Sequence, residues 1–202
     1  MSPNTHQELV ELHTRQGLKL HLGSGKDLRA GWINVDLLDG ADVKANLTKL
    51  PFDNEMASEV LLIHVLEHLS FDDERLALDE IYRVLQYGGR LSFEVPDLLW
   101  ICKHIVEADD IWRDFYKVTT DPTDKQYGFG YGAGVGVVHG QLMTYLYGNQ
   151  TTEYQYHRNG WTTGKVAGIA RHYGYEITKL DYLYGKGSQN IWAELVKREK
   201  SR

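Results

Sequence analysis

Two histidines and a glutamate lie close together in "HVLEH", residues 64–68. His64, Glu67 and His68 match the H-x-x-E-H pattern of one class of zinc peptidase, in which the histidines bind the metal and the glutamate activates water. That chemistry needs a helix, because only helical spacing brings both histidines to one face. The overlapping "EVLLIHV" (59–65) is instead an apolar run typical of a buried strand, with no helix-start signal before it. We therefore expect the five residues to span a strand end and the turn after it, facing a ligand crevice.

A second candidate site is the glycine loop of "HLGSGKDLRAGWINVD" (21–36). The alternating run before Gly23 and Gly25 indicates a strand that enters a tight loop, whose backbone amides can approach a ligand because no side chains obstruct them. Asp36 ends the next apolar run, where a carboxylate can accept hydrogen bonds from both hydroxyls of a ribose. Leu28 replaces the third glycine of the dinucleotide fingerprint, and Asp36 comes much sooner than the expected ~20 residues. The pattern therefore favours a nucleoside without a pyrophosphate.

Apolar periodicity predicts the elements that position these two sites. Strands are expected at 18–22, 32–36, 41–47, 59–65, 90–96, 175–184 and 190–198. An amphipathic helix is expected to begin at Asp72 and Asp73 and to stop at Gly88-Gly89. Further helices are expected ahead of Gly17, at 162–174 with Gly174 just past its end, and after a cap at Asp97. Strands that alternate with helices imply a parallel sheet covered on both faces. We predict an α/β fold: a Rossmann-like, doubly wound, mostly parallel sheet with an antiparallel C-terminal edge strand.

We expect residues 1–202 to form a single domain, because this length suits one sizeable core and no linker or repeat is visible. The segment of about 109–160 fits the alternation of strands and helices least well. It contains the glycine-rich "YGFGYGAGVG" (127–136), which suits neither a helix interior nor a packed strand. Long irregular segments in compact domains usually serve a function, so we interpret this one as a lid or substrate segment. A surface insertion without function is the alternative.

The composition argues against several classes of protein. A formal net charge of −6 gives no general basic surface, so nucleic acid is not the expected partner. No apolar run approaches the roughly 20 residues that span a bilayer, and the polar first residues show no secretory signal. Together with the single cysteine, Cys102, these features favour a cytoplasmic location. The sequence does not indicate an oligomeric state.

Several motifs in consecutive order resemble those of one enzyme family. Between residues 18 and 100 these are "LHLGSG", "GWINVDL", "ANLTKLPF", "VLLIHVLEHL" and "ALDEIYRVLQYGGRLSFEVPDL". Together they are similar to class I S-adenosylmethionine-dependent methyltransferases, in particular the small type 11-like group often linked with glycan and cell-surface biosynthesis. "YHRNGWT" and "HYGYEI", between residues 156 and 177, resemble the later part of that group. The resemblance implies an enzyme that uses S-adenosylmethionine, releases S-adenosylhomocysteine and methylates a small-molecule or carbohydrate acceptor.

The resemblance also implies which residues bind the cofactor. The glycine loop would hold its methionine part, the acid its ribose and the end of the third strand its adenine, with the end of the fourth strand beneath the sulfonium. These cofactor residues are Leu22, Gly23, Ser24, Gly25, Asp36, Leu37, Asn46, Leu47, His64 and Glu67. Asn46 stands where an aspartate is usual in the family, and its amide can still both donate to and accept from the purine edge.

Methyl transfer to a hydroxyl requires a group that removes the proton. The candidates for this base are His157, His139 and His68, together with His64, and for each a hydrogen-bonded structural histidine is the alternative. Glu67 and His68 could also bind a divalent ion, as in some related methyltransferases, but no clear set of further ligands is visible and we assign no metal. We expect in-line O-methylation of a small molecule or of a sugar or glycan precursor. A regulatory protein that binds the cofactor without catalysis is the alternative, and the zinc hydrolase is a third.

Overall fold

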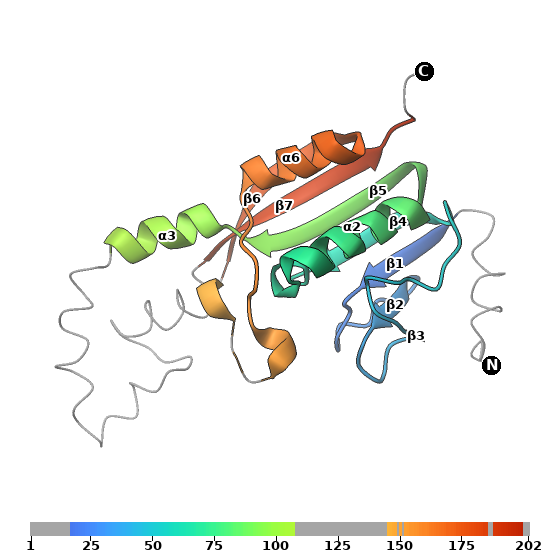
Figure 1. Ribbon diagram of the computed structural model, residues 1–202, viewed down its shortest axis with the longest axis horizontal. Helices are drawn as coiled ribbons and strands as arrows, with labels where there is room; N and C mark the ends of the chain where they lie inside the picture. The colour runs from blue at the N-terminus through green and yellow to red at the C-terminus, as the bar shows by residue number, and fades with distance from the viewer. Residues whose placement is uncertain (1–16, 108–144, 149, 151, 186–187, 200–202) are drawn as a thin grey trace.

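The computed structural model describes residues 17–107, 145–148, 150, 152–185 and 188–199 (Figure 1). The helix expected ahead of Gly17, most of the 109–160 segment and the base candidate His139 lie outside these residues. None of the described helices is both long and apolar enough to cross a membrane.

The described residues build one seven-stranded sheet in the order β3-β2-β1-β4-β5-β7-β6. The strands are β1 (Leu18–Leu22), β2 (Ile33–Asp36), β3 (Val43–Lys44), β4 (Ala57–Ile63), β5 (Leu85–Pro96), β6 (Tyr175–Gly185) and β7 (Ser188–Lys197). The first five strands are parallel, whereas β7 lies antiparallel between β5 and β6. The predicted α/β fold is confirmed, with the antiparallel strand next to the edge. The strand order reverses between β1 and β4, which is where a doubly wound sheet opens a ligand crevice.

The described part of the chain contains the α-helices α2 (Phe71–Val84), α3 (Leu98–Glu107) and α6 (Thr163–Tyr173), and residues 145–147 are also helical. Two 3-10 turns, η1 (Leu66–His68) and η3 (Glu153–Gln155), accompany them. The Thr162 side chain accepts the Lys165 N–H and so caps α6, and Gly174 with φ of 79° ends it, as the sequence predicts. Asp97 accepts the Leu99 N–H at 3.0 Å at the start of α3, again as predicted. Figure 1 shows α2 lying along the face of the sheet beside β4 and β5.

The expected boundaries of α2 are wrong at both ends. The helix begins earlier than Asp72 because Ser70, just ahead of it, already provides the cap by accepting the Asp73 N–H. It stops at Val84, ahead of Gly88-Gly89, and the chain continues directly into β5. The two glycines therefore lie inside a strand, near an irregularity in the β4–β5 register.

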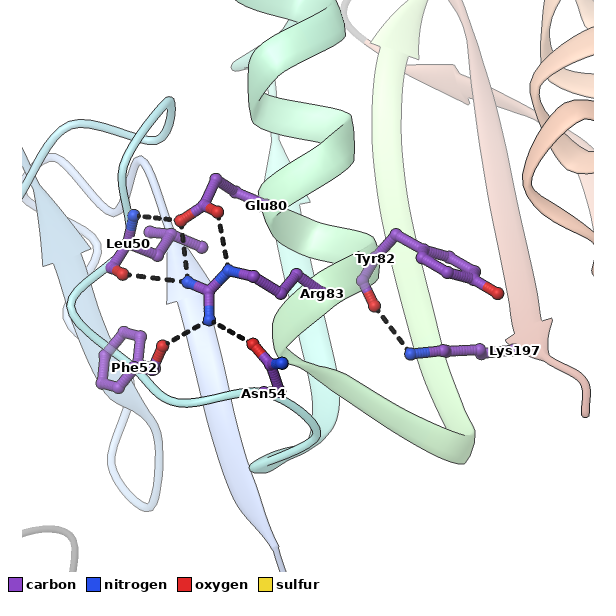
Figure 2. A network of polar contacts seen from close by, with 7 residues as sticks. All are labelled: Leu50, Phe52, Asn54, Glu80, Tyr82, Arg83 and Lys197. Atoms are coloured by element: carbon purple, nitrogen blue, oxygen red, sulfur yellow. Dashed lines mark hydrogen bonds and ion pairs between the residues drawn. The ribbon is translucent and has the colours of Figure 1, made fainter.

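The cause of the early helix end lies at the far end of the sequence. Lys197 on β7 is 2% exposed, and its ammonium donates to the Tyr82 carbonyl at 2.8 Å (Figure 2). It also donates to the Leu85 carbonyl at 2.7 Å. Carbonyls in the last turn of a helix have no helical partner, and a cation satisfies them well. The buried lysine thus fixes the point at which helix becomes strand.

Arg83 ties the loop between β3 and β4 to α2 (Figure 2). Its guanidinium forms a two-point contact with Glu80 at 2.7 and 2.8 Å. It also donates to the carbonyls of Leu50 at 3.1 Å and Phe52 at 2.7 Å and to Asn54 at 3.0 Å. Glu80 in turn accepts the Leu50 N–H at 2.7 Å, and the bond to Arg83 lowers the pKa of this carboxyl. The loop that follows β3 is held by charge-assisted hydrogen bonds rather than by a helix.

The sheet interior is largely apolar, and a chain of polar side chains crosses β1 and β2. The fully buried core side chains of the sheet include Leu20, Leu22, Val35, Val60, Leu62, Leu91, Val95, Ile191, Ala193 and Leu195. His21, 1% exposed, lies among them with its Nδ1 at 3.2 Å from the Asn34 side-chain oxygen. Asn34 donates to Asp42 at 2.8 Å, which completes the chain of bonds across β1 and β2. Burial lowers the pKa of His21 below its ordinary value of 6.5.

Candidate functional site

The glycine loop leaves β1 at the edge of the sheet where the parallel strands end. Gly23 and Gly25 have φ of 66° and 52°, in the left-handed region that favours glycine. The N–H groups of Gly23 and Ser24 both donate to the Val35 carbonyl, at 2.8 and 3.2 Å. These bonds hold the loop against the end of β2, at the point where the strand order reverses.

Asp36 joins this loop to the one that follows β2. Its Oδ2 accepts the Gly25 N–H at 2.7 Å and its Oδ1 accepts the Leu38 N–H at 2.9 Å. A carboxylate has about four lone-pair sites, so each oxygen keeps the capacity to accept a further hydrogen bond. The side chain can therefore bind a diol while it holds the loop in shape.

The surroundings of the loop suit a ligand. A Cβ added at Gly25 would meet no described atom within 4 Å, so the space beside this residue is open. The Ser24 hydroxyl is buried and has no hydrogen-bond partner among the residues the structure describes. Open space, a hydroxyl without a partner and a carboxylate able to bind a diol fit a nucleoside with a polar tail.

The predicted adenine contact follows β3. The Ala45 N–H donates to the Asp36 carbonyl at 2.9 Å, which brings the end of β3 beside the acid. Asn46 is exposed, and its side-chain oxygen accepts the Thr48 N–H at 3.0 Å. This bond forms an Asx turn, so the Asn46 oxygen has a structural role in addition to the predicted one.

The other apolar residues predicted to bind the cofactor divide into two groups. Leu22 and Leu47 are 0% and 7% exposed, so their side chains belong to the core and their backbones alone can contribute to a site. Leu37 is 43% exposed and follows Asp36 directly, where it offers an apolar surface.

A polar cluster follows β4. The strand ends at Ile63, and His64 has φ of 53°, which is uncommon for a residue other than glycine. Its Nδ1 lies 3.1 Å from Glu67 Oε1 and its Nε2 lies 3.5 Å from Glu94 Oε1. Asn190 on β7 donates to Glu94 at 2.7 Å. Glu94 and Asn190 carry no local sequence signal, although both lie where their strands meet the same edge as β4.

Val65 connects this cluster to the glycine loop. A Cβ added at Gly23 would lie 2.5 Å from a Val65 methyl carbon, closer than real Cβ contacts allow. The backbone of Gly23 therefore lies directly against Val65, the residue between His64 and η1. The glycine loop and the turn that carries the histidine cluster are therefore in direct contact.

The zinc-peptidase arrangement is not formed. Residues 66–68 form a 3-10 turn after a strand, as expected, and not part of an α-helix. Among the described residues, the set of possible metal ligands joins Glu67 and His68 to His157, with the ligand atoms within 4.8 Å of one another. His64 is not part of this set, so the H-x-x-E-H spacing does not produce the geometry that a zinc hydrolase of that class requires.

The segment 156–159 brings His157 to this point. The N–H groups of Arg158 and Asn159 donate to the Glu67 carbonyl at 2.8 and 3.1 Å. The rings of His157 and His68 meet edge to face, with centroids 4.8 Å apart. Burial lowers the pKa of His157 below 6.5, so this imidazole is neutral at neutral pH. Two of the predicted base candidates therefore lie together beside Glu67.

A buried charged group supports the same segment. Glu74 on α2 is 8% exposed and accepts hydrogen bonds from the Lys165 ammonium, at 2.6 Å, and from the Asn159 side-chain amide. Lys165 also donates to Asn159 at 2.8 Å. No local pattern in the sequence marks this trio, because its members come from α2, the 156–159 segment and α6.

Comparison with known families agrees with the sequence resemblance. Residues 21–93 match the family described as "Methyltransferase domain". Comparison with curated proteins finds no match.

Solved structures share the fold at low sequence identity. The 1,6-didemethyltoxoflavin-N1-methyltransferase of Burkholderia thailandensis, solved with 1,6-didemethyltoxoflavin and S-adenosylhomocysteine, is 16% identical with a TM-score of 0.53, over 96% of this chain and 78% of that one. An S-adenosylmethionine-dependent methyltransferase of Methanosarcina mazei is 14% identical with a TM-score of 0.55, over 93% and 97%. The N-methyltransferase NodS of Bradyrhizobium japonicum is 13% identical with a TM-score of 0.50, over 96% and 94%.

Proposed function

Because residues 21–93 match the methyltransferase-domain family, we propose that the protein transfers the methyl group of S-adenosylmethionine to a hydroxyl of a small molecule or of a sugar or glycan precursor. The observation that carries the proposal is the contact of Gly23 with Val65. This contact places a loop suited to a nucleoside against a turn that bears histidines and a carboxylate. A hydroxyl methyltransferase needs both functions side by side.

The glycine loop and Asp36 would hold the donor. S-adenosylmethionine supplies a methyl group on a positively charged sulfur that leaves as a neutral thioether, so no acid catalyst is needed. Asp36 would accept hydrogen bonds from the ribose hydroxyls, since both of its oxygens keep acceptor capacity. The Ser24 hydroxyl would bind the polar tail, and Leu37 would cover apolar ligand surface.

The histidines after β4 would serve the acceptor. The acceptor oxygen attacks the methyl carbon in line: the C–O bond forms as the C–S bond breaks, and sulfur keeps the electron pair. The hydroxyl proton passes to a neutral imidazole, for which His157 is suited because burial lowers its pKa. A general base of this kind contributes about 10²–10⁴-fold to the rate. Holding the two reactants in line contributes roughly 7–11 kcal/mol.

The polar groups around His64 favour an acceptor with several hydroxyls. Glu94 offers carboxylate oxygens and Asn190 offers an amide at the same edge of the sheet, 2.7 Å apart. The Asn190 side-chain oxygen is buried and has no hydrogen-bond partner among the described residues. Adjacent donors and acceptors of this kind match the neighbouring hydroxyls of a sugar.

Titration calorimetry of the full chain with S-adenosylhomocysteine tests the donor half of the proposal. We expect saturable binding at micromolar ligand. Absence of binding at high micromolar ligand would overturn the proposal.

An acceptor screen tests the other half. The protein is incubated with S-adenosylmethionine and a panel of sugars and small alcohols, each paired with the analogue that carries an amine in place of the hydroxyl. Mass spectrometry should detect one added methyl group on a hydroxyl acceptor. Methylation of the amines alone would contradict the O-methyl assignment, and cofactor binding without turnover on any acceptor would favour the regulatory protein without activity.

A further inference from the structure

We propose that Glu67, His68 and His157 bind a divalent transition-metal ion at the acceptor side of the glycine loop. Their ligand atoms lie within 4.8 Å of one another. The catalytic meaning of such an ion rests on the proposed methyl transfer, whereas the binding of the ion does not.

Both histidines are oriented as metal ligands are. His68 Nδ1 lies 3.1 Å from the Tyr156 carbonyl, and His157 Nδ1 lies 2.7 Å from the Tyr145 carbonyl. A carbonyl oxygen can only accept, so Nδ1 of each ring carries a proton and Nε2 is the nitrogen that can offer a lone pair to a metal. A backbone carbonyl bound to the second ring nitrogen is the usual support of a metal-binding histidine.

Glu67 supplies an anionic ligand that the protein leaves incompletely bonded. Its side chain is 2% exposed; Oε1 faces His64, and Oε2 is buried without a hydrogen-bond partner among the described residues. Burying a carboxylate oxygen without a partner is unfavourable. A cation between Glu67 and the two imidazoles would give this buried oxygen a partner, which no described protein group does.

The site is held in place before any ion binds. The Glu67 carbonyl accepts the N–H groups of Arg158 and Asn159, so the two segments that carry the ligands are joined backbone to backbone. Bonds of about 2.1 Å in tetrahedral geometry place ligand atoms about 3.4 Å apart. The widest separation of 4.8 Å therefore needs a closure of about 1.4 Å, which side-chain rotation can provide.

The ligand types select the class of metal. Two imidazole nitrogens and one carboxylate oxygen suit Zn²⁺, Co²⁺, Fe²⁺ or Mn²⁺, whereas Mg²⁺ and Ca²⁺ prefer oxygen ligands alone. His68 and His157 are partly exposed, so positions on the ion stay open to an incoming group. An acceptor hydroxyl bound there would lose its proton to solvent more readily, because a divalent ion lowers the pKa of a bound oxygen acid. With the ion bound, His157 would act as a metal ligand instead of as the base.

Cobalt titration of the full chain, free of any affinity tag and treated with chelator, tests the site. Co²⁺ is the probe because its visible absorption reports nitrogen ligands and low coordination, and calorimetry gives the stoichiometry. We expect one equivalent to bind and to show this absorption. Zn²⁺ should displace it, since Zn²⁺ binds such sites more tightly than Co²⁺.

Substitutions identify the ligands. Loss of a supporting partner of a ligand weakens a metal site by about 10–100-fold, so Glu67→Gln, His68→Ala and His157→Ala should each weaken Co²⁺ binding by at least about 100-fold. His172→Ala is the matched control, because His172 is an exposed histidine on α6 outside the cluster. Circular dichroism checks that each variant is folded. Failure of the native chain to bind Co²⁺, or equal binding by the His157 and His172 variants, would overturn the metal site.

A second titration keeps this result separate from the proposed function. S-adenosylhomocysteine binding is measured on the same samples, with and without Co²⁺. Binding of the nucleoside without binding of Co²⁺ would overturn the metal site and leave the methyltransferase proposal intact. Binding of Co²⁺ without the nucleoside would support the metal site and overturn the methyltransferase proposal.

Discussion

Asp36→Ala is expected to weaken the binding of S-adenosylhomocysteine about 30- to 1000-fold, which corresponds to about 2–4 kcal/mol. Hydrogen bonds to a charged group contribute about 1.5–3 kcal/mol each, and two ribose hydroxyls would donate to this carboxylate. Water that enters the space left by the side chain restores part of that free energy. The substitution also removes the bonds to the N–H groups of Gly25 and Leu38, so the loop must become ordered when the ligand binds.

Titration calorimetry at fixed pH and salt measures this loss of affinity, and two further variants serve as comparisons. Asp39→Ala changes another acid, in the loop that follows β2. Asp39 is exposed and paired with Lys44, so this substitution should alter the affinity less than twofold. Asp36→Asn keeps the size of the side chain but turns one acceptor into a donor that faces a backbone N–H. We therefore expect it to weaken binding more than about tenfold. A loss below tenfold for Asp36→Ala, or an equal loss for Asp39→Ala, would refute the assignment of the ribose to Asp36.

Three further substitutions test the framework of the site by urea unfolding. Gly23→Ala should lower the free energy of unfolding by more than the roughly 1–2 kcal/mol that a left-handed φ costs, because the new Cβ would meet Val65 at 2.5 Å. Gly25 has a similar φ but open space beside it. An equal loss of stability in Gly25→Ala would therefore contradict the clash with Val65. Arg83→Met should cost about 1.5–3 kcal/mol, since the carbonyls of the β3–β4 loop lose their charged donor, and an unchanged unfolding midpoint would show that the loop is held otherwise. The lowered pKa of His21 means that the folded state binds fewer protons than the unfolded state, so the associated stability is present above pH 6.5 and is lost as pH falls through the folded-state pKa. His21→Gln should therefore reduce the loss of stability between pH 7.5 and acidic pH, and equal pH dependence in both proteins would place the titrating group elsewhere.

The part of the fold that the sequence predicted depends on local patterns. Alternating and apolar runs marked the strands at 18–22 and 59–65, and Gly174 marked the end of α6, because each signal lies within the element that it describes. The end of α2 depends instead on Lys197, which reaches it from β7. Gly88 and Gly89, which the sequence pattern marks as the stop of this helix, therefore lie inside β5 instead.

The residues of the candidate site likewise include some that local patterns predicted and others that depend on contacts between distant segments. The glycine loop and the acid after the next strand could be located because both follow apolar runs, and parallel strands bring their ends to one edge. The pairing of His157 with Glu67 and His68 could not, because it depends on backbone hydrogen bonds between segments about 90 residues apart. Glu94 and Asn190 were missed for a related reason: their meeting requires the register of β5 with β7.

The reach of Lys197 back to α2 has a consequence for the order of synthesis. The helix and the strand after it leave the ribosome more than a hundred residues before the ammonium that ends the helix. Until then Lys197 cannot cap the carbonyls of Tyr82 and Leu85, and these carbonyls can instead accept the N–H groups of a helix that runs on toward the glycines. The nascent chain is therefore expected to carry an overlong helix, which the arrival of the last strand converts into the start of β5. Hydrogen exchange on ribosome-bound chains that end before and after residue 197 would detect this change.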